Sequence, residues 1–341
     1  MTSSIARVDL SHLRFGPTDR WGSFLSGVFD LDEDVCERVG WILRPMVARL
    51  AVQCVSGELD DPEGVLLASV DYIDPTVGYV DLLGVRPDCR GRGLARDLVA
   101  FAENVLLASG VDTVRWAANS PSWGWPGVDL RYTAGLGGVE ALGYTETRLA
   151  YDMTVDLADA ARRGVFAGCM AVARVWDGTA DGPGARDADR RLAEAGIVVL
   201  RGSDLTRGSE GGLDDVEARM FEWITAEFGI AWQVEVREAL RRAQAGHAAG
   251  VYVALNQEEI LGFAAYGVLR GRLFGPMGTA PAARGTGIGS RLLRECLADQ
   301  FMAGQERSDI AYVGPVSFYS RAVGARISRV YRLSSKRIVS G

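Results

Sequence analysis

One short segment occurs twice in this 341-residue chain, and the repeat constrains the fold more than any other feature. Residues 85–95 read VRPDCRGRGLA and residues 279–289 read TAPAARGTGIG, so both contain P-x-x-R-G-x-G-[LI]-[AG] in the same register. A strand-like apolar run precedes each copy, and apolar residues at helical spacing follow it. An internal repeat of this kind indicates that the chain folds as two units of one architecture.

The order of expected elements is also the same in the two halves. Apolar and alternating runs predict strands, which Gly, Pro and Asp turn signals separate. The strands expected in the first half lie near residues 49–56, 64–73, 77–86, 112–118 and 144–155. Those expected in the second half lie near 197–202, 250–256, 260–268, 271–279, 308–313 and 326–333, with helices near 212–228 and 231–245. Mixed sheets with helices on both faces, a mixed α/β (α+β) fold, fit this order.

A Gly-rich stretch marks the boundary between the halves. Residues 177–187 read DGTADGPGARD, which is typical of a linker, and residues 157–176 are expected to form a helix packed against one domain. We therefore predict an N-terminal domain over residues 1–157, a helical and Gly-rich linker over 158–194, and a C-terminal domain over 195–341.

Composition excludes several functional classes. The formal net charge is -7 and the sequence pI is about 5.1, so the chain lacks the excess of basic residues that nucleic-acid binding requires. No apolar stretch approaches the roughly 20 residues of a membrane helix, and the first residues show no signal-type apolar core. Five cysteines without a C-x-x-C pair and two histidines disfavour a metal site or a disulfide framework. We expect a cytoplasmic protein without metal, nucleic acid or membrane.

The repeated segment has the features of a phosphate-binding loop. A strand that passes through Pro and Arg-Gly-x-Gly into a helix presents backbone N–H groups at the positive end of that helix. A P-loop would need a lysine on the phosphates, and Lys336 is the only lysine in the chain. A dinucleotide fingerprint would need a third glycine where Arg96 and Ser290 stand, and Pro-x-x-Arg separates strand from glycines. Both rival motifs are therefore disfavoured.

The pattern that fits is [QR]-x-x-G-x-[GA], the pyrophosphate loop of the GNAT acyltransferases. Arg90, Gly93 and Ala95 satisfy it in the first copy, and Arg284, Gly287 and Gly289 satisfy it in the second. The chain therefore resembles a tandem GNAT protein, and it resembles above all those of bacterial natural-product pathways such as the clavulanic acid type, with mycothiol synthases more distant. This resemblance implies two domains, each a mixed, mostly antiparallel sheet with splayed central strands between flanking helices.

The resemblance also implies chemistry and contacts. The family transfers an acyl group from an acyl-CoA, most commonly acetyl-CoA, to a primary amine that attacks the thioester directly; here we expect an amine of a small metabolite or antibiotic-pathway intermediate. The strand before each loop would contact pantetheine and stabilise the oxyanion, a role that falls on Leu83, Gly84, Val85, Met277, Gly278 and Thr279. The pyrophosphate would lie on Arg90, Gly91, Arg92, Gly93, Leu94, Ala95 and Arg96 or on Arg284, Gly285, Thr286, Gly287, Ile288, Gly289 and Ser290. Asn119, after the next strand, would also touch the cofactor.

Two residues are candidates for proton transfer. Tyr319, in GPVSFYSRAVGA (residues 314–325), resembles the family's tyrosine that protonates the departing thiolate, although an aromatic packing role is an equal alternative. Its aligned position in the first half is Gly138, where Tyr132 or solvent would have to supply the proton. Asp81 is a candidate base for the amine, and the alternative is a solvated or capping charge; its aligned position is Gly275. We expect one domain to be catalytic, and the C-terminal loop and Tyr319 favour the C-terminal one.

Two tryptophans lie where an acceptor would approach. Trp123 and Trp125, in NSPSWGWPGVDLRY (residues 119–132), are expected to form an apolar wall for substrate, with simple coverage of the sheet as the alternative. A second functional class stays open, a CoA-binding but catalytically idle sensor or pathway partner, because neither half shows both an acid and a base. Sequence leaves the oligomeric state open, a monomer included.

Overall fold

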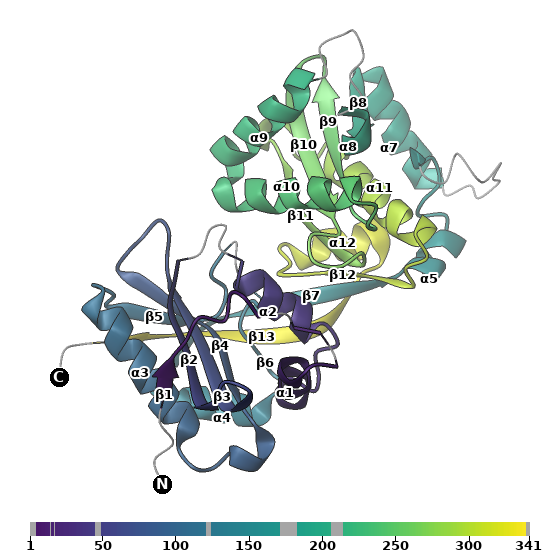
Figure 1. Ribbon diagram of the computed structural model, residues 1–341. Coiled ribbons are helices and arrows are strands. Elements are labelled where there is room, and N and C mark those ends of the chain that lie inside the picture. The colour runs from purple at the N-terminus through teal and green to yellow at the C-terminus, as the bar shows by residue number, and fades with distance from the viewer. Residues whose placement is uncertain are drawn as a thin grey trace. The chain divides into compact units, whose positions relative to one another are not determined.

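The computed structural model describes residues 5–13, 15–16, 18–44, 49–120, 124–170, 183–205 and 214–338 (Figure 1). The chain divides into two compact units. Unit 1 comprises Met1–Ala150 together with Arg329–Gly341, and unit 2 comprises Tyr151–Ser328. The last strand of the chain therefore belongs to the unit that the first half builds.

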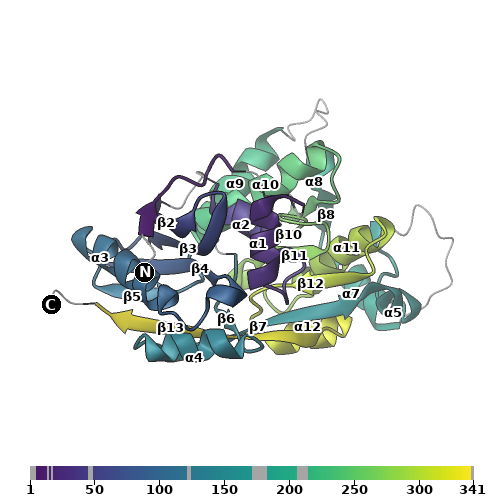
Figure 2. The same ribbon diagram turned by 60° about the horizontal axis from the view of Figure 1, so that its bottom comes forward.

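Unit 1 is built on a mostly antiparallel sheet. Its strands are β1 (Ile5–Arg7), β2 (Arg49–Glu58), β3 (Asp61–Val70), β4 (Val77–Val85), β5 (Thr113–Trp116), the two-residue β6 (Val128–Asp129), the start of β7 (Thr145–Asp156) and most of β13 (Arg326–Arg337). The order is β1-β2-β3-β4-β5-β13, with β6 also paired to β13. Only β4 and β5 are parallel in this series, and β13 pairs with β5 through Ser335–Arg115 and Arg337–Thr113 (Figure 2).

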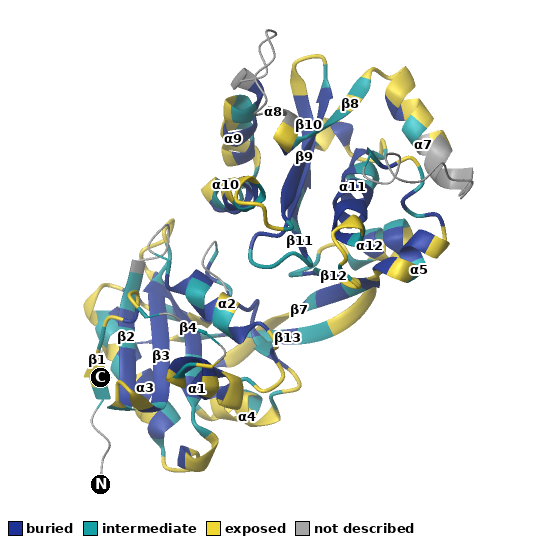
Figure 3. Cartoon of the chain, turned by 45° about the vertical axis from the view of Figure 1, so that its right-hand side comes forward, coloured by how far each residue is buried: buried dark blue, intermediate teal, exposed yellow. Residues whose placement is uncertain are grey.

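The helices of unit 1 cover both faces of this sheet. They are α1 (Arg20–Val28), α2 (Val35–Ile42), α3 (Leu94–Ala108) and α4 (Thr133–Ala141). Helix α3 packs on β2, β3 and β4 through Leu94, Leu98, Ala102 and Leu106, which recur at helical spacing and are buried. Helix α1 contacts β4 from the other side, and the Asp19 side chain caps it by accepting a hydrogen bond from Gly22. The strands between these helices are almost entirely buried (Figure 3).

Unit 2 repeats the plan. Its strands are β8 (Ile197–Arg201), β9 (Gly250–Asn256), β10 (Glu259–Tyr266), β11 (Leu273–Thr279), β12 (Arg307–Ile310) and the end of β7, in the order β7-β12-β11-β10-β9-β8. Its helices are α5 (Leu157–Arg162), α7 (Pro183–Glu194), α8 (Gly202–Leu205), α9 (Asp214–Phe228), α10 (Ile230–Gln244), α11 (Ile288–Met302) and α12 (Val316–Val323). Strands β11 and β12 form the parallel pair, as β4 and β5 do in unit 1. Helix α11 packs on β9, β10 and β11, as α3 packs on its strands.

The expected fold class is confirmed, and most strands lie within a few residues of their predicted positions. The expected helix over residues 157–176 is wrong in its described part, because α5 ends at Arg162 and Gly164 follows with a φ of 72°. Residues 183–187 of the expected linker begin helix α7. Residues 171–182 lie outside the described part of the chain. The domain boundaries at 157 and 195 stay a prediction; the two compact units divide within β7, after Ala150, and within β13, after Ser328.

Candidate functional site

Both copies of the repeated segment adopt the same backbone. A single 3-10 turn, Pro87–Cys89 or Pro281–Ala283, follows the strand and leads into the glycines. Gly91 and Gly93 have φ of 76° and 86°, and Gly285 and Gly287 have φ of 81° and 103°. These left-handed conformations favour glycine, which explains why both glycines recur in the repeat. Gly93 and Gly287 are then the N-terminal capping positions of α3 and α11.

The loops leave a row of backbone N–H groups available to a ligand. Within the described chain, no protein acceptor lies within hydrogen-bonding geometry of the amides from Gly91 to Arg96 or from Gly285 to Ser290. Each row lies at the start of a 15-residue helix, where the macrodipole favours an anion. Arg90 and Arg92 are exposed and bond to the backbone oxygens of Val85 and Asp88, and Arg284 is exposed. Each predicted pyrophosphate loop therefore has the geometry of an anion site.

The strand before the loop departs from its parallel neighbour in unit 1. Pairing of β4 with β5 runs from Val77–Thr113 to Val80–Trp116, and β5 ends there while β4 continues to Val85. On its other side β4 carries a bulge, since Val80 pairs with Ala68 and Leu82 with Leu67. Asp81 is the extra residue of that bulge. A bulge at the point where two strands separate re-aims the side chain that it carries.

The Asp81 side chain lies in a small buried polar cluster. Asp81, Ser69 of β3 and Asn119, which follows β5, are 4%, 0% and 2% exposed. The Asn119 amide donates a hydrogen bond of 2.6 Å to the Ser69 hydroxyl oxygen. Neither carboxyl oxygen of Asp81 has a hydrogen-bond partner within the described residues. Burial raises the pKa of Asp81 to about 7, and the neighbouring Ser69 hydroxyl moderates this rise.

Unit 2 has the same bulge but a different chemistry. Phe274 pairs with Tyr266 and Met277 with Ala264, so an extra residue lies in the segment Gly275–Pro276. Gly275 stands where unit 1 has Asp81 and contributes no side chain. The candidate acid Tyr319 lies on α12, 8% exposed, against the rings of Phe274 and Phe318. Burial alone raises its pKa to about 12, so its hydroxyl is protonated at neutral pH.

The strand residues expected to contact pantetheine lie at the ends of β4 and β11, and some of them pack against helices. A Cβ on Gly84 would lie 3.0 Å from Val28 of α1, and one on Gly278 would lie 2.5 Å from the Phe228 ring. These glycines therefore permit close packing of α1 in unit 1 and of α9 in unit 2. Leu83, Val85, Met277 and Thr279 are partly exposed, on the last residues of β4 and β11.

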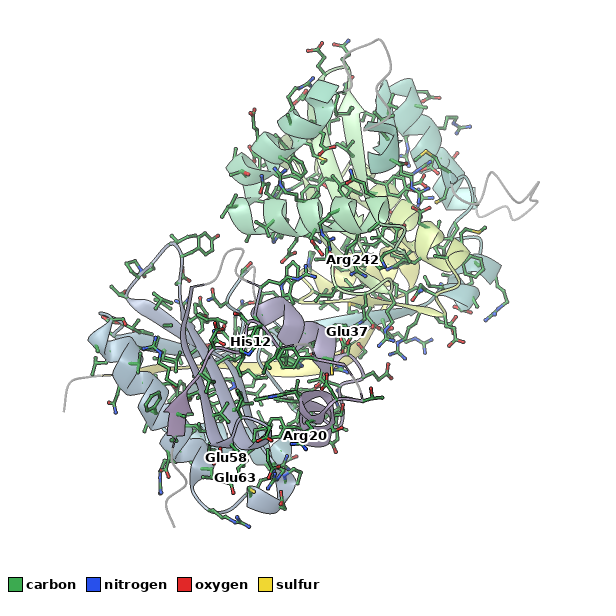
Figure 4. All side chains as sticks on the ribbon, viewed as in Figure 1. His12, Arg20, Glu37, Glu58, Glu63 and Arg242 are labelled. Atoms are coloured by element: carbon green, nitrogen blue, oxygen red, sulfur yellow. The ribbon has the colours of Figure 1, made fainter. Side chains whose placement is uncertain are left out.

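The other residues singled out in the sequence are two tryptophans, Tyr132 and the two histidines. Trp125 is 6% exposed and stacks on Phe29 with centroids 5.3 Å apart, beside Arg38, whereas Trp123 lies outside the described residues. The Tyr132 hydroxyl donates to Asp32 and accepts from the Leu31 amide, so it is already engaged. His12 and His247 are exposed, and Figure 4 shows His12 among the side chains of unit 1.

Sequence reasoning missed Ser69. No motif surrounds it, and it follows the apolar run 65–68 of β3, 12 positions before Asp81. The one available signal was a hydroxyl residue in a strand predicted to be buried, since buried polar groups need partners.

Family models match one segment in each half of the chain. The model of the acetyltransferase (GNAT) family matches residues 38–125, and that of the acetyltransferase (GNAT) domain matches residues 247–322. Each matched segment contains one copy of the repeated loop. The chain carries two GNAT domains in tandem. The predicted resemblance to tandem GNAT proteins is thereby confirmed.

A curated protein is similar to part of this chain, and solved structures are similar to it in fold. A mycothiol acetyltransferase from Beutenbergia cavernae is 47% identical over 57 residues, which is 16% of this chain and 19% of that protein. A tandem GNAT protein from the clavulanic acid biosynthesis pathway has a TM-score of 0.65 at 15% identity, covering 99% of both chains. The structure of a fungal multi-domain β-N-acetylglucosaminidase with a glucosamine N-acetyltransferase region has a TM-score of 0.69 at 16% identity, and the match covers 98% of this chain and 38% of that one. At these identities the solved structures share the fold.

No helix of the described residues combines the length and apolarity needed to cross a membrane. Among the same residues, no group of three His, Cys, Asp or Glu side chains is placed to hold a metal ion.

Proposed function

We propose that this tandem GNAT protein is an N-acetyltransferase that transfers the acetyl group of acetyl-CoA, or a related acyl-CoA, to an amine of a small metabolite or antibiotic-pathway intermediate. The two GNAT domains support the reaction class. The observation that carries the proposal is the pair of loops, each with its amides open at the start of a helix. Such a loop fits a pyrophosphate, which coenzyme A contains.

The reaction needs few groups from the protein. Acetyl-CoA supplies an acyl group already activated as a thioester. The chain must orient the amine, accept its proton, and stabilise the charge that develops on the carbonyl oxygen when the N–C bond forms and the C–S bond breaks. In unit 1, Asp81 is the candidate base and backbone N–H groups near Val85 are the candidate oxyanion donors. In unit 2, backbone N–H groups near Thr279 are the candidate oxyanion donors and Tyr319 is the candidate acid for the thiolate. The apolar wall predicted at Trp123 and Trp125 stays part of this proposal.

Titration of the protein with CoA, with the binding sites counted, tests the loops directly. Gly93→Glu and Gly287→Glu each place a carboxylate and a side chain where an anion would lie, so each is expected to abolish binding to its own unit. Matched controls are Gly110→Glu and Gly304→Glu, because these glycines follow α3 and α11, also have positive φ, and face open space. If neither loop substitution weakens binding, the loops do not hold CoA.

A catalytically idle CoA-binding protein is the second candidate. The observation in its favour is that Asp81 belongs to unit 1 and Tyr319 to unit 2, so neither unit has both groups. Native mass spectrometry with acetyl-CoA, followed by measurement of thiol release with a panel of amines, separates the two functions. Acceptor-dependent thiol release supports the transferase, and binding without it supports the idle protein.

A further inference from the structure

We propose that Ser69 and Asn119 position the carboxyl group of Asp81, and that the acceptor amine therefore loses its proton in unit 1. Ser69 and Asn119 act here as positioning residues, and Asp81 is the group that contacts the amine. The inference rests on the proposed transferase function, and it deepens it by assigning deprotonation to one unit and by adding a residue, Ser69, to the site.

The first observation is the direction of the hydrogen bond between Asn119 and Ser69. The Asn119 amide donates to the Ser69 oxygen at 2.6 Å, so this oxygen already accepts one bond and its own proton is available to a second group. Asp81 is the neighbouring acceptor whose pKa responds to Ser69. Ser69 is thus the group whose O–H can turn toward the carboxyl group, although no bond within normal hydrogen-bonding geometry joins the two in this structure. A donated hydrogen bond favours the ionised form, which is the form that a base needs.

The second observation is that the Asp81 carboxyl group is buried without a hydrogen-bond partner among the described residues. Both Asp81 oxygens are buried and lie outside hydrogen-bonding geometry with any described residue. Buried polar groups nearly always have partners, so an orphaned carboxyl group beside the end of β5 fits a ligand that donates hydrogen bonds to it. An amine or ammonium group is such a donor. The bulge places this side chain where β4 leaves β5, beside the strand that leads into the loop.

No other charge competes for this group. Desolvation and Ser69 are the only causes that shift the pKa of Asp81, so no charged side chain of the described residues on β3, β4 or the segment after β5 perturbs it. The nearby titratable residue on β4, Tyr79, is engaged with Asp71 at 2.9 Å and with Arg115 at 3.2 Å. We therefore expect the acidic limb of a pH profile to follow the ionisation of Asp81.

Unit 2 supplies an internal comparison, because all three residues change together. The strand registers of the two units show which positions are equivalent. Gly275 of unit 2 corresponds to Asp81 of unit 1, Gly267 to Ser69 and Val313 to Asn119. A side chain cannot be added at Gly267, since its Cβ would lie 2.4 Å from the Ala248 carbonyl oxygen. The Gly267 carbonyl instead accepts a hydrogen bond of 2.7 Å from Arg242 of α10, which Figure 4 labels. Unit 2 therefore has no room for an equivalent cluster.

The first experiment measures the Asp81 pKa without any reaction. Infrared difference spectra of the full chain, titrated from pH 4 to 9, report the protonated carboxyl band, and Asp81→Asn identifies it. We expect Ser69→Ala and Asn119→Ala to move its midpoint to higher pH by about one unit, and Ser69→Thr to restore it. Ser56→Ala is the matched control, because Ser56 is a fully buried serine of β2 whose hydroxyl has no partner. An unmoved midpoint in Ser69→Ala, or an equal shift in the control, overturns the positioning role.

The second experiment measures acetyl transfer across the same pH range, with CoA binding checked for each variant. Asp81→Asn is expected to lower kcat about 100-fold or more. Ser69→Ala is expected to lower kcat/KM about tenfold near pH 6 and to approach the unsubstituted protein near pH 9, with the KM for acetyl-CoA unchanged. Activity retained by Asp81→Asn overturns deprotonation in unit 1. Infrared shifts as expected, together with no transfer by the unsubstituted protein to any amine, would instead refute the proposed function.

Discussion

A carboxyl group buried without a partner resists ionisation, and Asp81 is in this situation at the bulge of β4. Its pKa of about 7 puts it between protonated and ionised at neutral pH, which suits a base that must take up and release a proton. At the matching point of unit 2, Gly275 and the buried Tyr319 offer a protonated hydroxyl but no carboxylate. A difference of single residues on one backbone thus separates the chemistry of the two units.

The raised pKa of Asp81 predicts how stability depends on pH. Because the folded-state pKa lies above the ordinary 3.8, the stability that this group contributes is present below about pH 4 and is lost as pH rises through 7. Asp81→Asn removes this dependence, so its stability relative to the unsubstituted protein should rise by up to about 4 kcal/mol between pH 4 and 8. Urea unfolding at both pH values measures the difference, and parallel stability curves would contradict the assignment.

Tyr319 gives a second prediction at this scale. Tyr319→Phe keeps the ring against Phe274 and Phe318 but removes the proton donor of unit 2. When it is added to the Asp81→Asn protein, the transfer that remains there should therefore fall about tenfold or more. Because the pKa of Tyr319 is about 12, no loss of activity from its ionisation is expected below about pH 11. Steady-state kinetics settle the point. Unchanged turnover would leave Tyr319 as a packing residue.

At the scale of elements, the helix after the second loop is fixed by a buried ionic network. Arg291 and Arg294 of α11 both bond to Asp189 of α7, at 3.1 Å and 2.6 Å. Arg291 also pairs with Glu295, whose carboxylate accepts the Met170 amide. Helix α11 begins at the loop glycine, so this network fixes the axis along which the loop amides point.

Removal of the Asp189 carboxylate should therefore lower the stability of the protein. Asp189→Ala leaves two largely buried guanidinium groups without their shared carboxylate, and we expect a loss of about 3 kcal/mol of unfolding free energy. Asp187→Ala is the matched control on the same helix, because its pair with Arg190 is exposed and should contribute less than about 1 kcal/mol. Denaturant unfolding compares the two, and equal losses would show that the buried network adds no stability.

At the scale of the whole molecule, the chain closes unit 1 with its own last strand. β13 contributes Arg329, which bonds to Asp32, and Lys336, which bonds to Glu103 of α3 at 2.9 Å. The single lysine of the chain therefore has a structural partner. Unit 1 consequently requires residues from both ends of the sequence.

Truncation after Ser328 tests this dependence. Without β13, β5 keeps β4 but loses its other neighbouring strand, and α3 loses the ion pair between Glu103 and Lys336. Amide protection should therefore fall in β5 and α3, while β9 and β10 of unit 2 keep theirs. Hydrogen exchange followed by mass spectrometry measures the effect peptide by peptide. A synthetic peptide of residues 326–341 should restore protection. Full protection in the truncated chain would mean that unit 1 folds without its last strand.

Local patterns in the sequence sufficed to predict the repeat, most strands, and the loop glycines. Strand periodicity and the need for positive φ act over a few residues, so they can be read without knowing the fold. Gly91, Gly93, Gly285 and Gly287 show the left-handed φ that the motif predicts. Local context also nominates Tyr319 and Asp81, whose catalytic roles stay predictions, and only the structure shows that both are buried.

Long-range contacts decided the rest. Ser69 lies near Asp81 only because β3 pairs with β4 and a bulge turns one residue, and Asn119 reaches Ser69 from the segment after β5. The assignment of residues 329–341 to unit 1 likewise depends on β13 pairing with β5, a partner more than 200 residues away in sequence. The sequence by itself determined two similar units with a phosphate-type loop in each. Only the tertiary structure decided which unit gathers a buried polar cluster and which segments complete each sheet, because pairing across strands is not encoded in neighbouring residues.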